Sequence, residues 1–102
     1  MGAVFFEGVL KLLSKIPRGR VTTYQEIARA LHNPGAGRAV GNACNANPNA
    51  PKVPCHRVVA SDGTVGGYAG GVKKKIALLK KEGVWIKNKR IVGFERKIWR
   101  FK

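Results

Sequence analysis

The chain has 102 residues, in which 20 lysines and arginines stand against five acidic residues, for a formal net charge of +15. That length allows a single domain, and a hydrophobic content of 44% favours a folded core over a disordered basic tail. No apolar run approaches the ~20 residues of a membrane span. We therefore expect an intracellular, cytoplasmic monomer (nuclear in a eukaryote), with no membrane contact and a polyanionic partner, most often nucleic acid.

The N-terminal part of the sequence predicts two helices. Apolar residues recur at helical spacing over residues 4–16, and Pro17 ends that segment. Thr23 and Glu26 then form a capping box, with Thr23 as the N-cap of a second helix. The side chains of this second helix that we expect to turn inward are Ile27, Ala28 and Leu31.

A third helix, made of small residues, is predicted from about Ala36 to Ala46. It follows the second helix after the turn-forming residues 32–35, and two short helices joined by a tight turn outline a helix-turn-helix. Small side chains let such a helix approach a partner or a groove closely, and Arg38 is the one charged residue on it. The same composition also suits a helix packed against its neighbours, so both interpretations stay open at this point.

The second half of the sequence predicts one more helix and a small β element. The helix covers about residues 72–82, with Gly83 as its C-cap. Residues 84–102 alternate loosely and predict a hairpin or an extended tail. The fold class is therefore mostly α with minor β, a winged-helix-like helix-turn-helix domain. The side chains that we expect to be buried here are Val72, Ile76, Leu79, in part Leu78, and the two packing residues Trp85 and Trp99.

Basic residues are concentrated toward the C-terminus. Residues 73–102 hold twelve lysines and arginines against two glutamates, so they carry most of the positive charge. Such a run is typical of a solvated face, and contact with phosphates is its functional interpretation.

Cys55 is the strongest candidate for chemistry. A thiolate nucleophile needs a nearby base or cation, and His56 and Arg57 follow Cys55 directly. Neighbours in sequence need not face each other, so a structural cysteine remains the alternative. Glu82 is the acidic residue best suited to orient His56.

Other kinds of site have weaker support. We expect no metal and no cofactor, because the cysteines and histidines lack the C-x-x-C or H-x-x-x-H spacing of zinc ligands. The glycine-rich residues 66–71 lack the lysine and hydroxyl residue of a phosphate-binding loop. They are predicted to form a flexible wall that contains Tyr68. The metal alternative would have used His32, Cys44, Cys55 and His56.

The segment Pro54-Cys55-His56-Arg57-Val58-Val59 resembles the active-site signature of the O6-alkylguanine-DNA alkyltransferases, or methylated-DNA–protein-cysteine methyltransferases. Matches in the family's order and spacing extend over residues 4–84, which resemble the family's C-terminal catalytic and DNA-binding domain. The resemblance implies a DNA repair protein that moves a methyl or alkyl group from O6-alkylguanine in double-stranded DNA to its own cysteine, once and irreversibly. The further matching segments are Thr23-Tyr24-Gln25, Arg38-Ala39-Val40-Gly41, Asn47-Pro48, Val65-Gly66 with Tyr68 and Gly70-Gly71, and Leu78-Leu79 with Glu82-Gly83.

The resemblance also implies roles for individual residues in catalysis. Cys55 is the alkyl acceptor, His56 acts through a water as the base that keeps it ionised, and Glu82 orients His56. Tyr24 donates a hydrogen bond or a proton to the guanine. Asn47 is a hinge residue that ties the third helix to the active-site loop.

A base inside a duplex hides its O6 substituent, so the resemblance implies that the nucleotide is flipped out while Arg38 fills the gap. DNA contacts are expected from the helix-turn-helix, at Thr23, Tyr24, Ala36, Arg38, Gly41, Asn42 and Asn45. The pocket for the alkylated base is expected to be lined by Val58, Val65, Gly66, Tyr68, Ala69 and Gly70.

The chain also departs from the family pattern. The family's usual N-terminal domain, which holds a structural zinc in some members, is expected to be absent, so that residues 1–102 form one domain with 84–102 as a basic tail outside the resemblance. At the base pocket, Ala69 and Gly67 replace a hydroxyl residue and an asparagine.

Two other functions stay open. Short stand-alone domains of this kind resemble the alkyltransferase-like proteins, which bind alkylated DNA without repairing it. Those typically have Trp or Ala where this chain has Cys55. The leading alternative function is a lesion-binding protein that flips the base and recruits other repair factors. The other alternative is a plain helix-turn-helix DNA-binding protein in which Cys55 is inert.

Overall fold

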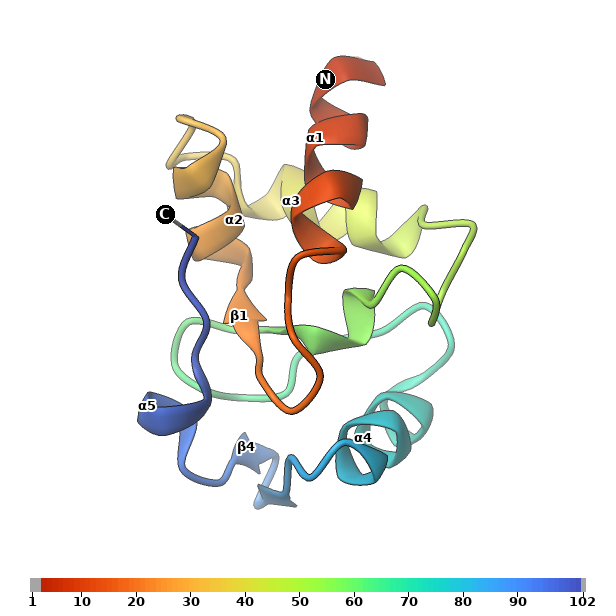
Figure 1. Cartoon of the computed structure of the whole chain (residues 1–102), viewed down its shortest axis with the longest axis vertical. Helices are drawn as coiled ribbons and strands as arrows, with labels where there is room; N and C mark the ends of the chain where they lie inside the picture. The colour runs from red at the N-terminus through yellow and green to blue at the C-terminus, as the bar shows by residue number, and fades with distance from the viewer. Residues whose placement is uncertain (1–2, 102) are drawn as a thin grey trace.

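The computed structural model describes residues 3–101 and is mostly helical with small β elements, as the sequence predicts (Figure 1). Helices α1, α2 and α3 form one half of the molecule, and α4 with the C-terminal hairpin forms the other. The elements in chain order are α1 (Ala3–Leu13), β1 (Thr22–Thr23), α2 (Tyr24–Ala30), α3 (Gly37–Asn45), the 3₁₀ turn η1 (Cys55–Arg57), β2 (Val58–Val59), α4 (Val72–Lys81), β3 (Ile86–Lys87), β4 (Arg90–Ile91) and α5 (Phe94–Lys97).

Helix α1 ends three residues earlier than predicted. It buries Val9 and Leu13, and then tightens into a turn in which the Ile16 amide donates to the Leu13 carbonyl at 3.2 Å. The α conformation is disfavoured for a residue that precedes a proline. Pro17 therefore ends the helix before Ile16, although Pro17 itself lies outside it. The Ile16 side chain still enters the core, with 2% of its surface exposed.

Helices α2 and α3 form the predicted helix-turn-helix. The Thr23 hydroxyl accepts from the Glu26 amide at 3.0 Å, which is half of the expected capping box. The other half is replaced, because the Glu26 carboxylate pairs with Arg29 and Arg100. His32 closes α2 in the left-handed conformation, with φ of 59°, which is the position that glycine usually takes after a helix.

A short parallel ladder joins the helix-turn-helix to the segment that carries Cys55. Strands β1 and β2 pair Thr22 with Val58 and Thr23 with Val59. Strand β1 runs directly into α2, and β2 follows η1 directly. The start of the helix-turn-helix and the end of the cysteine turn are therefore held in one register.

Helix α4 differs from its predicted burial pattern. Leu79 is buried as expected, but Val72 is 41% exposed and Lys75 is completely buried in its place. Lys75 and Leu79 are four residues apart and share one face of the helix, whereas Val72 lies in a first turn that extends beyond the core. Gly83 ends the helix as predicted, with φ of 82° and the paired bonds of a Schellman motif to Lys80 and Leu79.

The tail contains the predicted hairpin and a further structure that the sequence did not predict. Strands β3 and β4 pair across Asn88 and Lys89, which both have positive φ, as a two-residue hairpin turn requires. Helix α5 follows, and the chain then runs back along β1, with Ile98 bridging Val21 and the Trp99 amide donating to the Val21 carbonyl. The tail is thus part of the fold as well as a basic surface.

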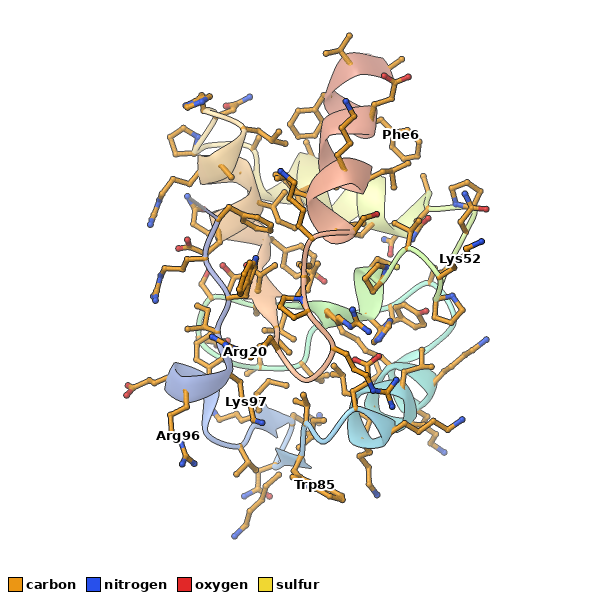
Figure 2. The ribbon with its side chains drawn as sticks, in the orientation of Figure 1. Phe6, Arg20, Lys52, Trp85, Arg96 and Lys97 are labelled. Atoms are coloured by element: carbon orange, nitrogen blue, oxygen red, sulfur yellow. The ribbon has the colours of Figure 1, made fainter. Side chains whose placement is uncertain are left out.

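The two tryptophans have different environments. Trp99 packs against the core formed by α1, α2 and α3, as predicted, and the Arg20 guanidinium lies 5.9 Å from its ring centroid. The prediction for Trp85 was wrong, because its side chain is 57% exposed and projects from the end of the molecule at the hairpin (Figure 2). Trp85 contacts Lys80, whose ammonium lies 5.8 Å from the ring.

Candidate active site and nucleic-acid interface

The thiol of Cys55 is buried at the start of the 3₁₀ turn η1, with 4% of the residue exposed. The turn begins after Pro54, and the Cys55 amide donates to the Val53 carbonyl at 2.9 Å. The Arg57 amide closes the turn on the Pro54 carbonyl at 3.0 Å. The tight turn brings three consecutive side chains, those of Cys55, His56 and Arg57, into the interior between the helix-turn-helix and α4.

His56, Arg57 and Glu82 form a connected polar cluster. His56 Nε2 lies 3.0 Å from a Glu82 carboxylate oxygen, and Arg57 donates to both oxygens of the same carboxylate at 2.9 and 2.7 Å. Burial raises the pKa of Glu82, but the hydrogen bonds from Arg57 and His56 outweigh burial and lower that pKa overall. Glu82 is therefore a carboxylate that fixes both basic side chains.

The same cluster sets the proton positions on His56. Burial lowers the pKa of His56, and the contact with Glu82 opposes that shift without reversing it. A neutral ring that donates from Nε2 to Glu82 has a free lone pair on Nδ1. Nδ1 is buried and has no hydrogen-bond partner in the part of the chain that the structure describes. The arrangement leaves a proton acceptor available on the residue next to Cys55.

Tyr24 and Lys75 also lie near the thiol. Burial raises the pKa of Tyr24 to about 12, and the nearby Cys44 and Cys55 add to the effect. Lys75 donates to the Val58 carbonyl at 2.6 Å and to the Gly67 carbonyl at 3.0 Å, and its ammonium lies 5.9 Å from the Tyr24 ring. Burial lowers the pKa of Lys75 to about 8.

Lys75 was missed by sequence reasoning, although a signal for it existed. It lies four residues before Leu79, on the buried stripe of α4, where an apolar residue is the usual choice. A lysine on such a stripe needs buried acceptors for its ammonium, and the carbonyls of Val58 and Gly67 supply them. Lys75 therefore links α4 to both walls of the candidate pocket.

The residues predicted to line the base pocket divide into two groups. Gly66 lies beside Tyr24, since a Cβ on it would sit 3.4 Å from the Tyr24 hydroxyl. Burial raises the pKa of Tyr68, and the neighbouring Cys55 raises it further. Tyr68 and Val58 belong to the same core cluster as Cys55. By contrast, the structure places Val65 in the second core cluster, with Val21 and Val59, and leaves Ala69 and Gly70 exposed on the loop.

Asn47 holds the loop between α3 and the cysteine turn. Its side-chain amide donates to the Val53 carbonyl at 2.7 Å, and its side-chain oxygen accepts from the Asn49 amide at 3.0 Å. The described contacts of the Asn47 side chain are with this loop, two residues before Cys55. These two bonds fix the loop that leads to the cysteine turn.

Helix α3 and the start of α2 border a pocket with a volume of about 530 Å³, which we call the α3 pocket. Five predicted DNA-contact residues come together there. Thr23 and Ala36 do not, because both are buried, Thr23 as the cap of α2 and Ala36 in the core. Four lining residues were not predicted, and Tyr24 lines the α3 pocket as well as lying near Cys55. The lining residues are Tyr24, Gln25, Gly37, Arg38, Gly41, Asn42, Asn45, Ala60 and Ser61.

Neither a metal site nor a membrane segment is visible in residues 3–101. No three His, Cys, Asp or Glu side chains in this range gather closely enough to hold a metal ion, and none of its helices is long and apolar enough to cross a bilayer. Cys44 and Cys55 are both free and buried. Burial raises the pKa of Cys44 to about 12, so its thiol is protonated.

The family model of the 6-O-methylguanine DNA methyltransferase DNA-binding domain matches residues 4–84. The chain belongs to this family. It is 50% identical over 82 residues to the methylated-DNA–protein-cysteine methyltransferases of Shigella flexneri and Methanosarcina acetivorans. These matches cover 80% of this chain but 48% and 53% of the relatives, so the chain spans about half their length.

Solved structures of the methyltransferase family have the same fold. The Mycobacterium tuberculosis OGT in complex with DNA matches with a TM-score of 0.77 and 48% identity, over 80% of this chain and 51% of that one. Schizosaccharomyces pombe Atl1, in complex with damaged DNA containing O6-carboxymethylguanine, matches with a TM-score of 0.88 and 30% identity over 99% of both chains. The Atl1 match includes the tail, which lies outside the family model.

Proposed function

We propose that this protein repairs DNA by transferring a methyl or alkyl group from O6-alkylguanine irreversibly to Cys55, one group per molecule. The observation that carries the proposal is the environment of the thiol. Cys55 lies next to His56, whose Nδ1 lone pair is free while Nε2 is held by Glu82, and near the partly buried Tyr24. These are the groups that activation of a thiol and release of a guanine require.

Each step of the proposed transfer has a residue to perform it. His56 Nδ1, through one water, takes the thiol proton, and the Cys55 sulfur attacks the alkyl carbon. The carbon–O6 bond breaks as the sulfur–carbon bond forms, and the electron pair remains on the guanine. Tyr24 donates a proton to the guanine ring and regains one, through water, from the protonated His56. The products are therefore an S-alkylcysteine and an unmodified neutral guanine, with Tyr24 and His56 both neutral again. A thioether is a stable product, which limits each molecule to one turnover.

The α3 pocket is the proposed site of DNA contact. The exposed side chains of Arg38, Asn42 and Asn45 lie along the outer face of α3, where a recognition helix meets a groove. Because Tyr24 borders both this surface and Cys55, a nucleotide that leaves the duplex here has a short path to the thiol. We propose that Arg38 occupies the gap that this nucleotide leaves.

A second candidate function is binding of the alkylated base without repair. The match to Atl1 over 99% of both chains, tail included, favours it. Cys55 favours transfer, because the lesion-binding proteins that this chain resembles typically have Trp or Ala at that position. The two functions share DNA contacts and differ in whether the thiol reacts.

Mass measurement separates the two functions. The protein is mixed with an excess of duplex that carries one O6-methylguanine, and its intact mass and Cys55 peptide are measured. We expect a gain of one methyl group on Cys55 that stops at one equivalent. The Cys55→Ser variant should gain no mass and still bind the duplex. Tight binding by the wild type with no gain in mass would establish lesion binding, and loss of DNA binding by the variant would make Cys55 a structural residue.

We also propose that this chain corresponds to the family's C-terminal domain and that its tail belongs to that domain. We propose that residues 3–101, tail included, act as one unit. The Val21 amide donates to the Lys97 carbonyl, the Trp99 amide donates to the Val21 carbonyl, and Trp99 packs on the same core as Cys55.

A further inference from the structure

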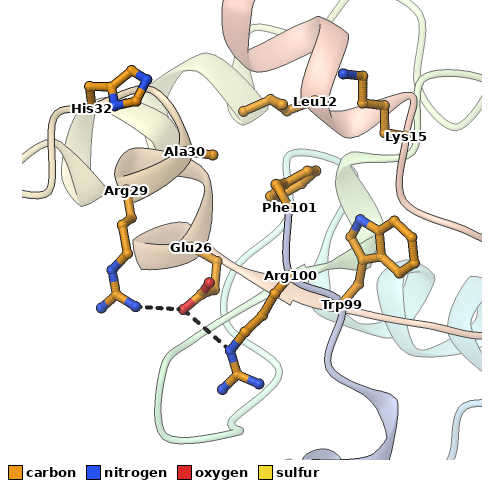
Figure 3. Close-up of a pocket in the computed structure, with 9 residues that line it drawn as sticks. All are labelled: Leu12, Lys15, Glu26, Arg29, Ala30, His32, Trp99, Arg100 and Phe101. Atoms are coloured by element: carbon orange, nitrogen blue, oxygen red, sulfur yellow. Dashed lines mark hydrogen bonds and ion pairs between the residues drawn. The ribbon is translucent and has the colours of Figure 1, made fainter.

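A second pocket, of about 770 Å³, lies between the end of α1, helix α2 and residues 99–101 of the tail (Figure 3). We call it the tail pocket. It shares no lining residue with the α3 pocket. Helix α2 contributes Tyr24 and Gln25 to the α3 pocket, and Glu26, Arg29 and Ala30 to the tail pocket. A ligand in the tail pocket would therefore leave the α3 pocket free.

The tail pocket combines an apolar floor with a cationic rim. Leu12, Ala30 and Phe101 supply the floor, and Lys15, Arg29 and Arg100 supply the rim. This is the composition expected of a site that takes an apolar group with acidic groups beside it.

The acidic residue in this pocket does not neutralise the rim. The Glu26 carboxylate lies 3.1 Å from Arg29 and 3.8 Å from Arg100, so one negative charge is shared by two guanidinium groups. Both arginine side chains remain about two-thirds exposed, at 63% and 64%. Their remaining donors are available to an anionic ligand.

Trp99 forms part of the wall of the pocket. The indole nitrogen of Trp99 is buried and has no hydrogen-bond partner among residues 3–101. In Figure 3 the five-membered ring of Trp99 is turned toward Phe101 and Lys15. This nitrogen is closed off from solvent, so Trp99 offers an occupant of the pocket ring surface and no accessible donor.

We propose that the tail pocket binds an acidic peptide segment of another protein, anchored by one aromatic or aliphatic side chain. The carboxylates pair with Arg29 and Arg100, and the anchor covers the floor of Leu12, Ala30 and Phe101. A second copy of this chain suits the pocket poorly, because each copy carries a net charge of +15. Duplex DNA suits it poorly as well, since its outer surface offers phosphates but no apolar anchor.

The test is a selection from a random 12-residue peptide library, carried out with unmodified duplex DNA present to occupy the DNA-binding surface. We expect the enriched peptides to carry acidic residues around one aromatic or aliphatic residue. The Arg29→Ala/Arg100→Ala double variant should weaken their affinity at least about tenfold, and its affinity for duplex DNA should fall no further than that of a variant that loses two exposed cations elsewhere on the tail.

Two further variants make the result specific. The Lys87→Ala/Arg96→Ala variant loses the same charge from exposed positions outside the tail pocket and should bind the peptides as the wild type does. The Ala30→Gln variant keeps both arginines but fills the floor, and should weaken binding. The proposal is overturned if no acidic peptide is enriched, if both double variants lose binding equally, or if a single-stranded oligonucleotide displaces every selected peptide.

Discussion

Cys55 depends for its proposed reactivity on side chains that are themselves fixed by ion pairs. No described hydrogen bond joins the Arg57 side chain to the Cys55 thiol. Arg57 holds both Glu82 oxygens and the Ile16 carbonyl, the last at 2.7 Å. Glu82 in turn fixes His56. The orientation of the proposed base is therefore set two contacts away from the thiol, at the junction of η1, α4 and the end of α1.

Replacing Glu82 tests this arrangement. Glu82→Gln keeps the shape but leaves the Arg57 guanidinium, 15% exposed, without its counter-charge. Removal of one partner of a buried pair costs about 3 kcal/mol, and we expect that loss in urea unfolding at pH 7. Transfer to Cys55 should also slow, because a glutamine does not hold a neutral His56 in one orientation.

The pH dependence of stability gives an independent check of Glu82. The folded pKa of Glu82 lies below its ordinary value, so the unfolded chain binds a proton first as the pH falls. The contribution of Glu82 is complete above its ordinary pKa of about 4.3 and is lost as the pH falls through the folded pKa. The stability difference between wild type and Glu82→Gln should therefore narrow in that range, and a constant difference would contradict the ion-pair role.

Alanine substitutions at two glycines of the 66–71 loop test whether the loop lines the pocket, one as the test and the other as its control. Gly66 and Gly71 both have positive φ, at 72° and 98°, so alanine at either position is strained. A Cβ on Gly66 would lie 3.4 Å from the Tyr24 hydroxyl, whereas a Cβ on Gly71 meets nothing within 4 Å. We expect both alanine variants to lose stability, and Gly66→Ala alone to slow alkyl transfer in single-turnover assays.

At the scale of elements, the signals that were local in sequence predicted the structure well. The Thr23 cap, the stop at residues 32–35 and the Gly83 terminus each depend on a few adjacent residues, and each occurs as predicted. Burial on α4 was less predictable, because Lys75 is buried by carbonyls that come from β2 and the glycine-rich loop. A pattern within one helix carries no information about such distant acceptors.

In the candidate site, too, local signals predicted the structure better than contacts between distant segments. The neighbourhood of Cys55, His56 and Glu82 was expected from motif spacing, and the three residues are brought together. Val65, Ala69 and Gly70 were assigned to the base pocket from the resemblance to the family. Their positions depend on how the loop is anchored, and the Val65 amide bonds to the Lys89 carbonyl of the hairpin at 2.8 Å.

Helix α3 presents one exposed cation, Arg38, between small residues. If Arg38 supports the extruded nucleotide, Arg38→Ala should slow repair of O6-methylguanine in a duplex by about tenfold or more, about 1.4 kcal/mol. Reaction with the free O6-methylguanine base should be nearly unchanged, because no gap then needs filling. Lys11→Ala on α1 is the control for the loss of one surface charge, and equal effects on both substrates would contradict the role of Arg38.

At the scale of the whole molecule, the tail closes the fold. After the hairpin the chain crosses to β1, where the Thr22 hydroxyl donates to the Trp99 carbonyl at 2.8 Å and the Arg20 side chain donates to the carbonyls of Lys97 and Ile98 at 3.0 and 2.8 Å. Trp99 and Phe101 then reach the core shared by α1 and α2. The first and last parts of the chain therefore stabilise each other.

The two tryptophans test this closure directly. Trp99→Ala should destabilise the protein by about 3 kcal/mol, the lower end for a large aromatic residue in a core, because Trp99 is partly buried against the α1–α3 core. Trp85→Ala removes an equally large but exposed side chain and should change the free energy of unfolding by about 0.5 kcal/mol or less. Urea titrations followed by circular dichroism give both values, and equal losses would contradict the assignment.

Burial of the Lys75 amine makes it an internal reporter of motion. Lys73 and Lys74 in the same helix are exposed, whereas Lys75 is 0% exposed and bonded to two carbonyls. An amine-reactive reagent can therefore acylate its neighbours on the native protein but can reach Lys75 only after α4 separates from β2 and the glycine-rich loop. The rate at which Lys75 becomes labelled, relative to Lys73 and Lys74, thus measures how often this part of the molecule opens.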